Sequence, residues 1–297
     1  MDGLPIVSRA WVRSIHRRVI ADDPHLRVYH TARYILAEVL GLEWGDANAG
    51  PAKKSGNFLK NDFSDDDKGA QAKHFMRVTG LAEMLVNLQR VPGYHECASQ
   101  LKVPTKLEST IAELEVGKLL YIYGIRFEFN TPKSKKTEDY DLHIWYRDGR
   151  KAYADTKCKL EGGTPSENTI LTALKRARSQ LPPRLPGIVF VKVPREWIED
   201  ESYADRIAGI AAGFLKGTSR VVSVKFYVAS VPIDSDSMGE VIAVREIMTT
   251  RQDFGIGMDW SLFPRDPDAV DTNALMLTAD WFRRYGVAKR GSARRAR

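Results

Sequence analysis

The first hundred positions of the chain show apolar residues at helical spacing, interrupted by one long polar stretch. Within residues 8–41, the sequence YHTARYILAEVLGL places apolar and aromatic residues every three to four positions, which predicts helix. A second helix is predicted over residues 73–88, before Pro92 breaks the pattern. The intervening residues are rich in Gly, Lys and Asp. We therefore predict a helical N-terminal region over residues 1–100 with a polar insertion loop at about 45–70.

From residue 106 onwards the pattern changes to short apolar runs that alternate with helices. A helix is predicted over residues 106–124, because Gly124 suits a left-handed helix end. The elements that follow are strands at 125–129, 140–146 and 151–158, a helix at 167–181, a strand at 187–193, a helix at about 202–216, and strands at 221–228 and 239–247. This order, α-β-β-β-α-β-α-β-β, predicts an α/β fold with a mixed sheet.

Two neighbouring strands are expected to form a hairpin, and a later strand is expected to lie inside the sheet. The runs at 140–146 and 151–158 are joined by a turn that contains Asp148-Gly149, and Asp-Gly is a strong hairpin signal. The run at 187–193 is apolar throughout, as expected of a strand buried on both faces.

Alternation sorts the side chains of the strand at 151–158 onto two faces. One face carries small side chains, which suits a closely packed helix: Ala152, Ala154, Thr156 and Cys158. The other face carries larger and charged side chains: Tyr153, Asp155, Lys157 and Lys159. An acid and a lysine two positions apart arise readily by chance in a chain with 28% charged residues. As a surface ion pair, Asp155 and Lys157 would contribute well under about 1 kcal/mol.

A second carboxylate is expected beside this pair, because the partner strand of the hairpin begins with acidic residues. In TEDYDLHI, Asp141 lies near the start of the strand that pairs with 151–158, and can therefore lie next to Asp155. Two carboxylates at that distance repel each other unless a cation neutralises them. Mg²⁺ prefers a few hard oxygen ligands, and a nearby lysine can orient or deprotonate an attacking water. The pattern therefore predicts a hydrolytic metal site.

The order of these motifs resembles the PD-(D/E)XK nuclease superfamily, which includes restriction endonucleases and archaeal Holliday-junction resolvases. The matching motifs are an acidic helix (AELEVGKLLYIYG), DYDL, DTK, and a helix that carries a glutamine, together spanning residues 106–193. The resemblance implies a restriction endonuclease-like α-β-β-β-α-β core within a domain at 101–265, after the helical N-terminal region. The chain departs from the pattern at Tyr140, where a proline often precedes the metal aspartate.

The resemblance also implies roles for the residues of the hairpin. Asp141 and Asp155 are expected to bind Mg²⁺ or Mn²⁺ together with the backbone carbonyl of Thr156. Lys157 is expected to activate water. Asp139 stays open as the alternative to Asp141.

On the helices, the resemblance implies two further site residues. Glu113 is expected to complete the metal site, and Glu115 stays open as its alternative, because the two lie on different helix faces and periodicity does not decide. Gln180 matches the polar residue that some members place on the second core helix.

His143 shares a face with Asp141 and is expected to contact substrate or to play a structural part.

The net charge of +7 is concentrated at the end of the chain. The last ten residues carry five basic side chains and no acid, which leaves +2 for the rest. We assign residues 266–297 to a C-terminal extension whose basic tail binds phosphates loosely or keeps the chain in solution. Further basic residues lie on the 167–181 helix and before the hairpin, where they form a solvated face or follow a phosphate backbone: Lys133, Lys135, Lys136, Lys175, Arg176 and Arg178.

No signal for a membrane or for secretion is visible. Apolar runs are far shorter than the roughly 18 residues that a membrane span requires. The first residues, MDGLPIVSRAW, lack a basic start followed by an apolar block. Cys97 and Cys158 form no paired framework. These features favour a reduced cytoplasm.

Together the patterns predict a Mg²⁺-dependent nuclease that hydrolyses phosphodiester bonds in DNA. Two alternatives stay open. The chain could be a non-catalytic nucleic-acid-binding or assembly protein that keeps the nuclease fold, or a defence or toxin component whose activity needs a partner chain. The N-terminal helices are expected to serve substrate recognition, homodimer formation or binding of a partner protein.

Overall fold

The predicted alternation of strands and helices forms one mixed sheet with helices on both faces. The computed structural model describes residues 3–49, 59, 68–131, 137–159, 166–194, 197, 200–230, 241–249 and 259–263. The first part of the chain contains helices α1 (Arg9–Arg18), α2 (Pro24–Leu40), α3 (Leu42–Ala49), α4 (Lys68–Asn87) and α5 (Tyr94–Ser99). After two 3₁₀ turns come α6 (Leu107–Ile122), β1 (Arg126–Phe129), β2 (Leu142–Trp145), β3 (Lys151–Cys158), α7 (Glu167–Gln180), β4 (Gly187–Lys192), α9 (Glu201–Lys216), β5 (Val221–Ser230) and β6 (Val241–Met248).

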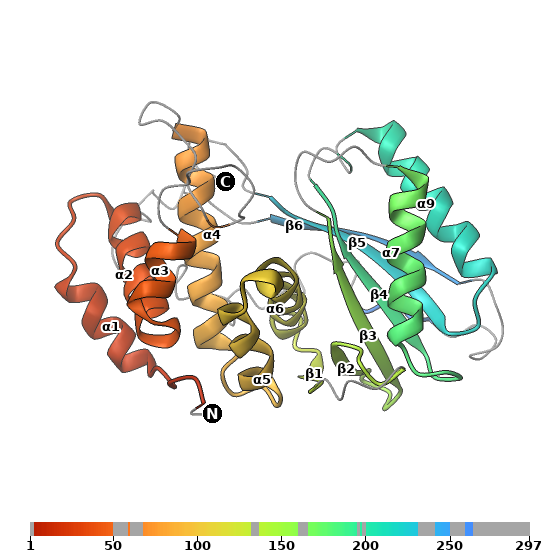
Figure 1. Cartoon of the computed structure of the whole chain (residues 1–297), viewed down its shortest axis with the longest axis horizontal. Helices are drawn as coiled ribbons and strands as arrows, with labels where there is room; N and C mark the ends of the chain where they lie inside the picture. Colours follow the sequence, from red (N-terminus) through yellow and green to blue (C-terminus); the bar gives the residue numbers. More distant parts are fainter. Residues whose placement is uncertain are drawn as a thin grey trace, which may run out of the picture.

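The six strands lie in the sheet in the order in which they occur in the chain. The pairs β1–β2, β2–β3 and β5–β6 are antiparallel, whereas β3, β4 and β5 run parallel to one another. Every residue of β4 is buried, as its apolar sequence predicts. Helix α6 packs on one face of the sheet, and α7 and α9 cover the other (Figure 1). The predicted α/β class and mixed sheet are therefore confirmed.

Two glycines end elements where the sequence predicts. Gly124 follows α6 with a φ of +61°, in the left-handed region that a glycine adopts without steric cost. Gly149 has a φ of +85° in the turn between β2 and β3, and the Tyr146 N–H donates to the Arg150 carbonyl across that turn (2.9 Å). The predicted hairpin is confirmed.

The two faces of β3 meet different helices. Ala152 and Ala154 belong to the buried cluster that α6 shares, so this small-residue face accepts a closely packed helix as predicted. Tyr153 packs on the other side, against the cluster that includes Ile170 and Leu174 of α7. Asp155 and Lys157 therefore lie on the face of the sheet that α7 covers.

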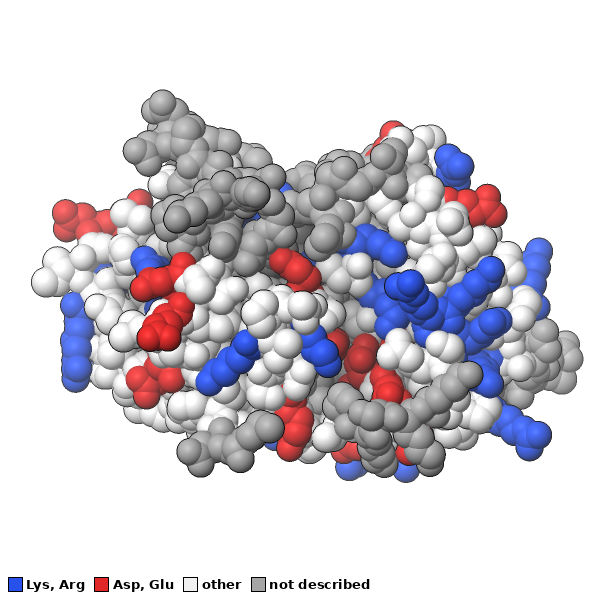
Figure 2. Space-filling model, viewed as in Figure 1, with Lys and Arg blue, Asp and Glu red and all other residues white. Residues whose placement is uncertain are grey.

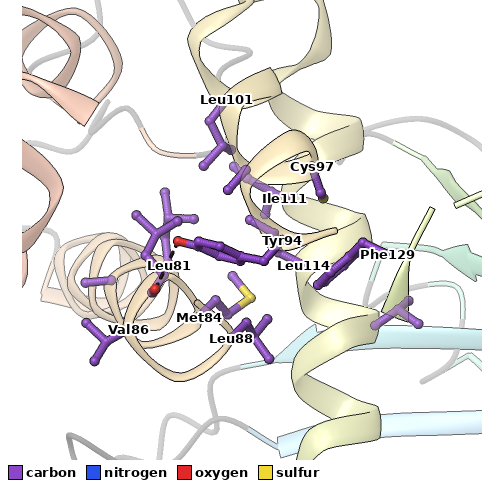
Figure 3. Close-up of a cluster of buried hydrophobic side chains, with 14 of the residues drawn as sticks. Leu81, Met84, Val86, Leu88, Tyr94, Cys97, Leu101, Ile111, Leu114 and Phe129 are labelled. Carbon is purple, nitrogen blue, oxygen red and sulfur yellow. Dashed lines mark hydrogen bonds between the residues drawn. The ribbon is translucent and has the colours of Figure 1, made fainter. Parts of the chain in front are cut away.

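Helix α6 is buried around nearly its whole circumference, because it lies between the N-terminal helices and the sheet. Figure 3 shows one part of this core, where Tyr94 of α5 lies between Leu81 and Met84 of α4, Ile111 and Leu114 of α6, and Phe129 of β1. The Tyr94 hydroxyl donates to the Leu85 carbonyl (2.9 Å). No described helix combines the length and the apolar composition that crossing a membrane requires.

The N-terminal region differs from the sequence prediction in three details. Residues 8–41 form two helices rather than one, because the chain is extended at Val19 and Pro24 begins α2. Helix α3 occupies the start of the predicted loop at 45–70, with Trp44 buried and its Nε1 donating to the Leu101 carbonyl (2.8 Å). Helix α4 begins five residues before the predicted start, at Lys68. Most of the predicted loop and the extension at 266–297 lie outside the described residues.

Candidate active site

The register of the β2–β3 hairpin brings Asp141 next to the second strand. Leu142 pairs with Ala154, and the Asp141 N–H donates to the Ala154 carbonyl (2.9 Å). The Asp141 side chain then turns toward β3, where its Oδ2 accepts a hydrogen bond from the Thr156 N–H (2.5 Å). The carboxylate of Asp141 is thereby held beside Asp155 by the backbone itself.

Asp155 and Lys157 form a chain of contacts that reaches α7. Asp155 is fully buried, and Lys157 Nζ lies 2.5 Å from its Oδ2. The same Nζ donates to Gln180 Oε1 (2.7 Å), at the end of α7. Gln180 Nε2 in turn donates to the Asp139 carbonyl (3.2 Å). Gln180 therefore holds the lysine from one side while Asp155 holds it from the other.

Helix α6 supplies Glu113, and not Glu115, to this group. Glu113 lies close enough to Asp141 and Asp155 for their charges to raise its pKa. Glu115 instead faces the sheet, where Lys192 Nζ meets its Oε1 at 2.6 Å and the Tyr227 hydroxyl donates to its Oε2 (3.5 Å). Of the two acids between which periodicity did not decide, Glu113 therefore lies near Asp141 and Asp155, and Glu115 lies against Lys192 and Tyr227.

The other open alternative is resolved in the same way. Asp141 faces the group and affects the pKa of both Asp155 and Glu113. Asp139 takes part through its backbone carbonyl, which accepts the hydrogen bond from Gln180. The structure therefore brings Asp141, Asp155, Lys157 and Gln180 together at the end of the hairpin, with Glu113 of α6 near enough for the charges of Asp141 and Asp155 to affect its pKa.

The carboxyl groups of this site are difficult to ionise in the absence of a further cation. Burial raises the pKa of Asp141 to about 6, against the opposing effects of the Lys157 charge and the Thr156 N–H. Burial also raises the pKa of Asp155 and of Glu113 well above the usual carboxyl range, and the charge of Asp141 adds to both shifts. Among the described residues, the Lys157 ammonium contacts Asp155 and its charge lowers the pKa of all three carboxyls.

Two of these carboxyls, Asp141 and Asp155, carry oxygen atoms of the kind that bind a divalent cation. Asp155 Oδ1 is buried and accepts no hydrogen bond from the described residues, so one oxygen is left for a ligand. No group of three or more His, Cys, Asp or Glu side chains in the described ranges is arranged so that it could hold a metal ion. Mg²⁺ keeps several of its waters and relies on few protein ligands, so the pair of Asp141 and Asp155 is the part of this group that suits it.

A cysteine from the N-terminal region also reaches this group. The Cys97 thiol of α5 donates to Glu113 Oε2 (3.6 Å). Burial raises the pKa of this thiol, and the charges of Glu113 and Asp141 add to the shift, so the proton stays on sulfur. Only the fold joins Cys97 to Glu113, and no motif in the sequence singles it out.

His143 lies one row of side chains away from the carboxyls. Its Nε2 contacts the Tyr140 hydroxyl, and its Nδ1 lies 3.4 Å from Glu128 Oε1. The Tyr140 and Tyr153 rings pack on the imidazole with centroids 5.0 Å away. His143 is therefore part of an aromatic surface that continues from the site along β2.

Basic side chains border the site on the α7 side. Lys175 and Arg176 are exposed on α7, and Arg178 is partly buried beside Phe214. Burial lowers the pKa of Lys159 at the end of β3, and the charges of Arg176 and Lys157 lower it further. Figure 2 shows lysines and arginines gathered over α7, beside acidic side chains. The basic residues predicted before the hairpin, Lys133, Lys135 and Lys136, lie outside the described residues.

In comparisons with known proteins, no family model, no curated protein and no solved structure matches the chain. A functional assignment therefore depends on the geometry and chemistry of these residues.

Proposed function

We propose that the chain is a divalent-metal-dependent nuclease of the PD-(D/E)XK type that hydrolyses phosphodiester bonds in DNA. The observation that carries the proposal is the meeting of Glu113, Asp141, Asp155 and Lys157, which come from α6, the start of β2 and the end of β3. The succession α6-β1-β2-β3-α7-β4 supports a restriction endonuclease-like core, because that fold requires this order of elements. Cytoplasmic location stays a prediction.

Asp141 and Asp155 would hold the metal, with Glu113 and the Thr156 carbonyl as further oxygen groups. A bound Mg²⁺ neutralises the carboxylates and stabilises the negative charge that develops on the phosphate during hydrolysis. No other cation among the described residues contacts these carboxyls besides Lys157. Their raised pKa values support the proposal that a cation binds beside them.

Lys157 is positioned to handle the attacking water. Its ammonium group is fixed between Asp155 Oδ2 and Gln180 Oε1, so it points at the same place as the carboxylates. There it can orient a water molecule, and in its neutral form it can accept the proton that the water loses. The exposed Lys175 and Arg176 lie on the neighbouring helix, where they can contact phosphates on either side of the cleaved bond.

Cleavage assays with linear, branched and single-stranded DNA in Mg²⁺ or Mn²⁺ test the proposal. We expect the wild type to cut at least one of these substrates, and Asp155→Asn and Lys157→Met to lose roughly 100-fold or more in rate, as expected for groups at the reacting atoms. The matched control Lys102→Met removes an exposed lysine outside the site and should cut normally. Cleavage that is unchanged in both site variants would refute the proposal.

A binding measurement gives a readout that does not depend on activity. Mg²⁺ added to the wild type should raise the unfolding temperature, because it binds the native state alone and relieves the repulsion between the carboxylates. Asp155→Asn should abolish the shift. A wild type that binds DNA but neither cuts it nor responds to Mg²⁺ would instead favour the non-catalytic alternative.

A further inference from the structure

The face of the sheet that carries Asp155 presents three rows of side chains across β1, β2 and β3. Paired residues in antiparallel strands lie on the same side, so each row is a set of direct neighbours. The rows are Arg126–Trp145–Lys151, then Glu128–His143–Tyr153, then Asp141–Asp155 at the candidate site. Four residues along β3 separate the outermost row from Asp155, which corresponds to about 13 Å.

The outermost row is the most exposed of the three, and the second row is partly buried. Helix α7 packs on β3 and β4, and α9 packs on β5 and β6, so these helices lie over the other half of this face. Arg126 and Lys151 are exposed, and Trp145 and His143 are partly exposed. This aromatic and basic strip therefore runs along the hairpin surface up to the carboxylates.

The outermost row combines one large ring with two cations. The Arg126 guanidinium lies 4.9 Å from the Trp145 ring centroid, and Lys151 Nζ lies 5.9 Å from it. The acid of the next row, Glu128, approaches His143 Nδ1 at 3.4 Å. Two cationic groups on either side of one ring repel each other, and a phosphate between them would relieve that repulsion.

The strip continues inward as a set of packed rings. His143 lies 5.8 Å from Trp145 and 5.0 Å from Tyr153, measured between ring centroids. Rings that alternate with cations match the chemistry of a nucleic-acid single strand, which offers a flat base and a phosphate in each unit. Bases inside a duplex are stacked on one another and cannot use such a surface.

We propose that the row of Arg126, Trp145 and Lys151 binds a single-stranded segment of DNA next to the cleaved bond. The two cations contact the backbone, and Trp145 and His143 provide the surface on which bases stack. The proposal deepens the proposed function, because the position of the cleaved phosphodiester, a few nucleotides away, depends on Asp155 being the reaction site. The binding of a single strand by this row does not depend on catalysis.

Binding of labelled oligonucleotides without divalent metal tests the proposal. Fluorescence anisotropy should show that Trp145→Ala weakens single-strand binding about five-fold or more, the size expected for one lost stacking contact. Trp145→Phe keeps a ring and should recover most of the affinity. The double variant Arg126→Met/Lys151→Met keeps the aliphatic packing and should weaken binding with a reduced salt dependence. Duplex affinity should change less than about two-fold in Trp145→Ala, because paired bases do not reach the ring.

Two controls separate a lost stacking contact from a general loss of charge or of folding. Arg13→Met removes an exposed arginine from α1 and should bind normally, and thermal unfolding confirms that each variant is folded. Equal single-strand affinity in Trp145→Ala and wild type, or equal losses for single strand and duplex, would overturn the proposal. If the wild type cuts DNA and Trp145→Ala binds single strands as well as the wild type does, only this inference is refuted. If the wild type never cuts DNA but Trp145→Ala weakens single-strand binding, the nuclease function is refuted and the inference stands.

Discussion

Glu113 is a buried carboxyl in surroundings that oppose its ionisation. Burial and the charge of Asp141 raise its pKa well above the usual range, while the Cys97 thiol donates the hydrogen bond that partly offsets this. A carboxyl whose pKa is raised by folding stabilises the native state only while it is protonated. At neutral pH in the absence of metal, Glu113 should therefore lower the free energy of unfolding. Functional groups commonly destabilise the fold that holds them.

Replacing Glu113 by glutamine should stabilise the metal-free protein at neutral pH by about 1–2 kcal/mol, because the amide keeps the shape and removes the charge. The advantage should shrink as the pH falls from neutral toward the ordinary carboxyl range and vanish below it, because the unfolded wild-type chain then also keeps Glu113 protonated and its raised pKa no longer costs stability. Chemical denaturation at several pH values measures this difference. The same variant should lose most of its Mg²⁺-dependent stabilisation.

Glu96→Gln is the matched control, since Glu96 is exposed on the neighbouring helix α5. It should leave stability unchanged within about 0.5 kcal/mol at every pH. An equal or lower stability of Glu113→Gln at neutral pH would contradict the idea that the cluster holds uncompensated charge.

Gln180 contacts Lys157, and we expect it to act by positioning that lysine. It accepts from Lys157 Nζ (2.7 Å) and is anchored to the Asp139 carbonyl (3.2 Å), so it limits where the ammonium group can move. Gln180→Ala should lower kcat about ten-fold, the scale seen when an outer positioning contact is removed. DNA affinity should stay nearly unchanged.

Gln180→Glu keeps an acceptor for Lys157 and should recover part of the rate, whereas Ser179→Ala, at an exposed neighbouring position, should have no effect. Single-turnover kinetics and anisotropy measure rate and affinity separately. A loss confined to affinity would place Gln180 in DNA binding instead of lysine positioning.

At the scale of elements, the distance between α6 and β1 decides whether Glu113 reaches the hairpin. Gly117 lies one turn after Glu113 and faces two rings of β1: an added Cβ would lie 2.6 Å from Phe129 Cζ and 3.3 Å from Phe127 Cε2. The helix can therefore lie this close to the strand only without a side chain at this position. We therefore expect the place of Glu113, one turn earlier on α6, to depend on this close approach.

Gly117→Ala should destabilise the protein by about 1–2 kcal/mol, since overpacking outweighs the gain in helix propensity. Displacement of α6 should also weaken Mg²⁺ binding. Gly209→Ala in α9 is the matched control, because a Cβ there meets no atom within 4 Å. It should stabilise the protein by about 0.5–1 kcal/mol. Thermal unfolding with and without Mg²⁺ compares the two, and equal behaviour would show that α6 does not depend on Gly117 for its place.

Across the whole molecule, the elements could be predicted from local sequence signals, whereas the contacts between distant segments could not. The bounds of β3 and the hairpin turn follow from alternation and from Asp148-Gly149, and with them the place of Asp141 beside the strand. Periodicity could not choose between Glu113 and Glu115, because α6 is buried on nearly all sides. Each acid has its own polar partner: Cys97 donates to Glu113, and Lys192 donates to Glu115. The part of α3 from residue 45 onward falls in the predicted loop, because its local sequence does not show that Trp44 is anchored to Leu101, 57 positions away.

Because α6 is buried on both sides, the N-terminal helices and the sheet share one core. One continuous apolar cluster includes residues of α2, α4, α5 and α6 together with Ile144, Ala154 and Phe190 of the sheet. The Phe129 N–H donates to the Pro92 carbonyl (2.9 Å), and Cys97 contacts Glu113. The N-terminal helices therefore belong to the core around α6 and bring Cys97 to Glu113 at the candidate site.

A fragment that begins at residue 104 should consequently fail to fold. Removal of the preceding helices would expose the side of α6 that carries Ile111 and Leu114, now buried among Leu81, Met84 and Tyr94. Each such apolar side chain contributes about 1.5–3 kcal/mol when buried, so losing several exceeds the stability of an ordinary domain. Circular dichroism should show no cooperative unfolding transition in the fragment, and gel filtration should show aggregation. A monomeric fragment that unfolds cooperatively and binds Mg²⁺ would instead show that the N-terminal helices are a separable module. It would also show that Glu113 keeps its position without Cys97.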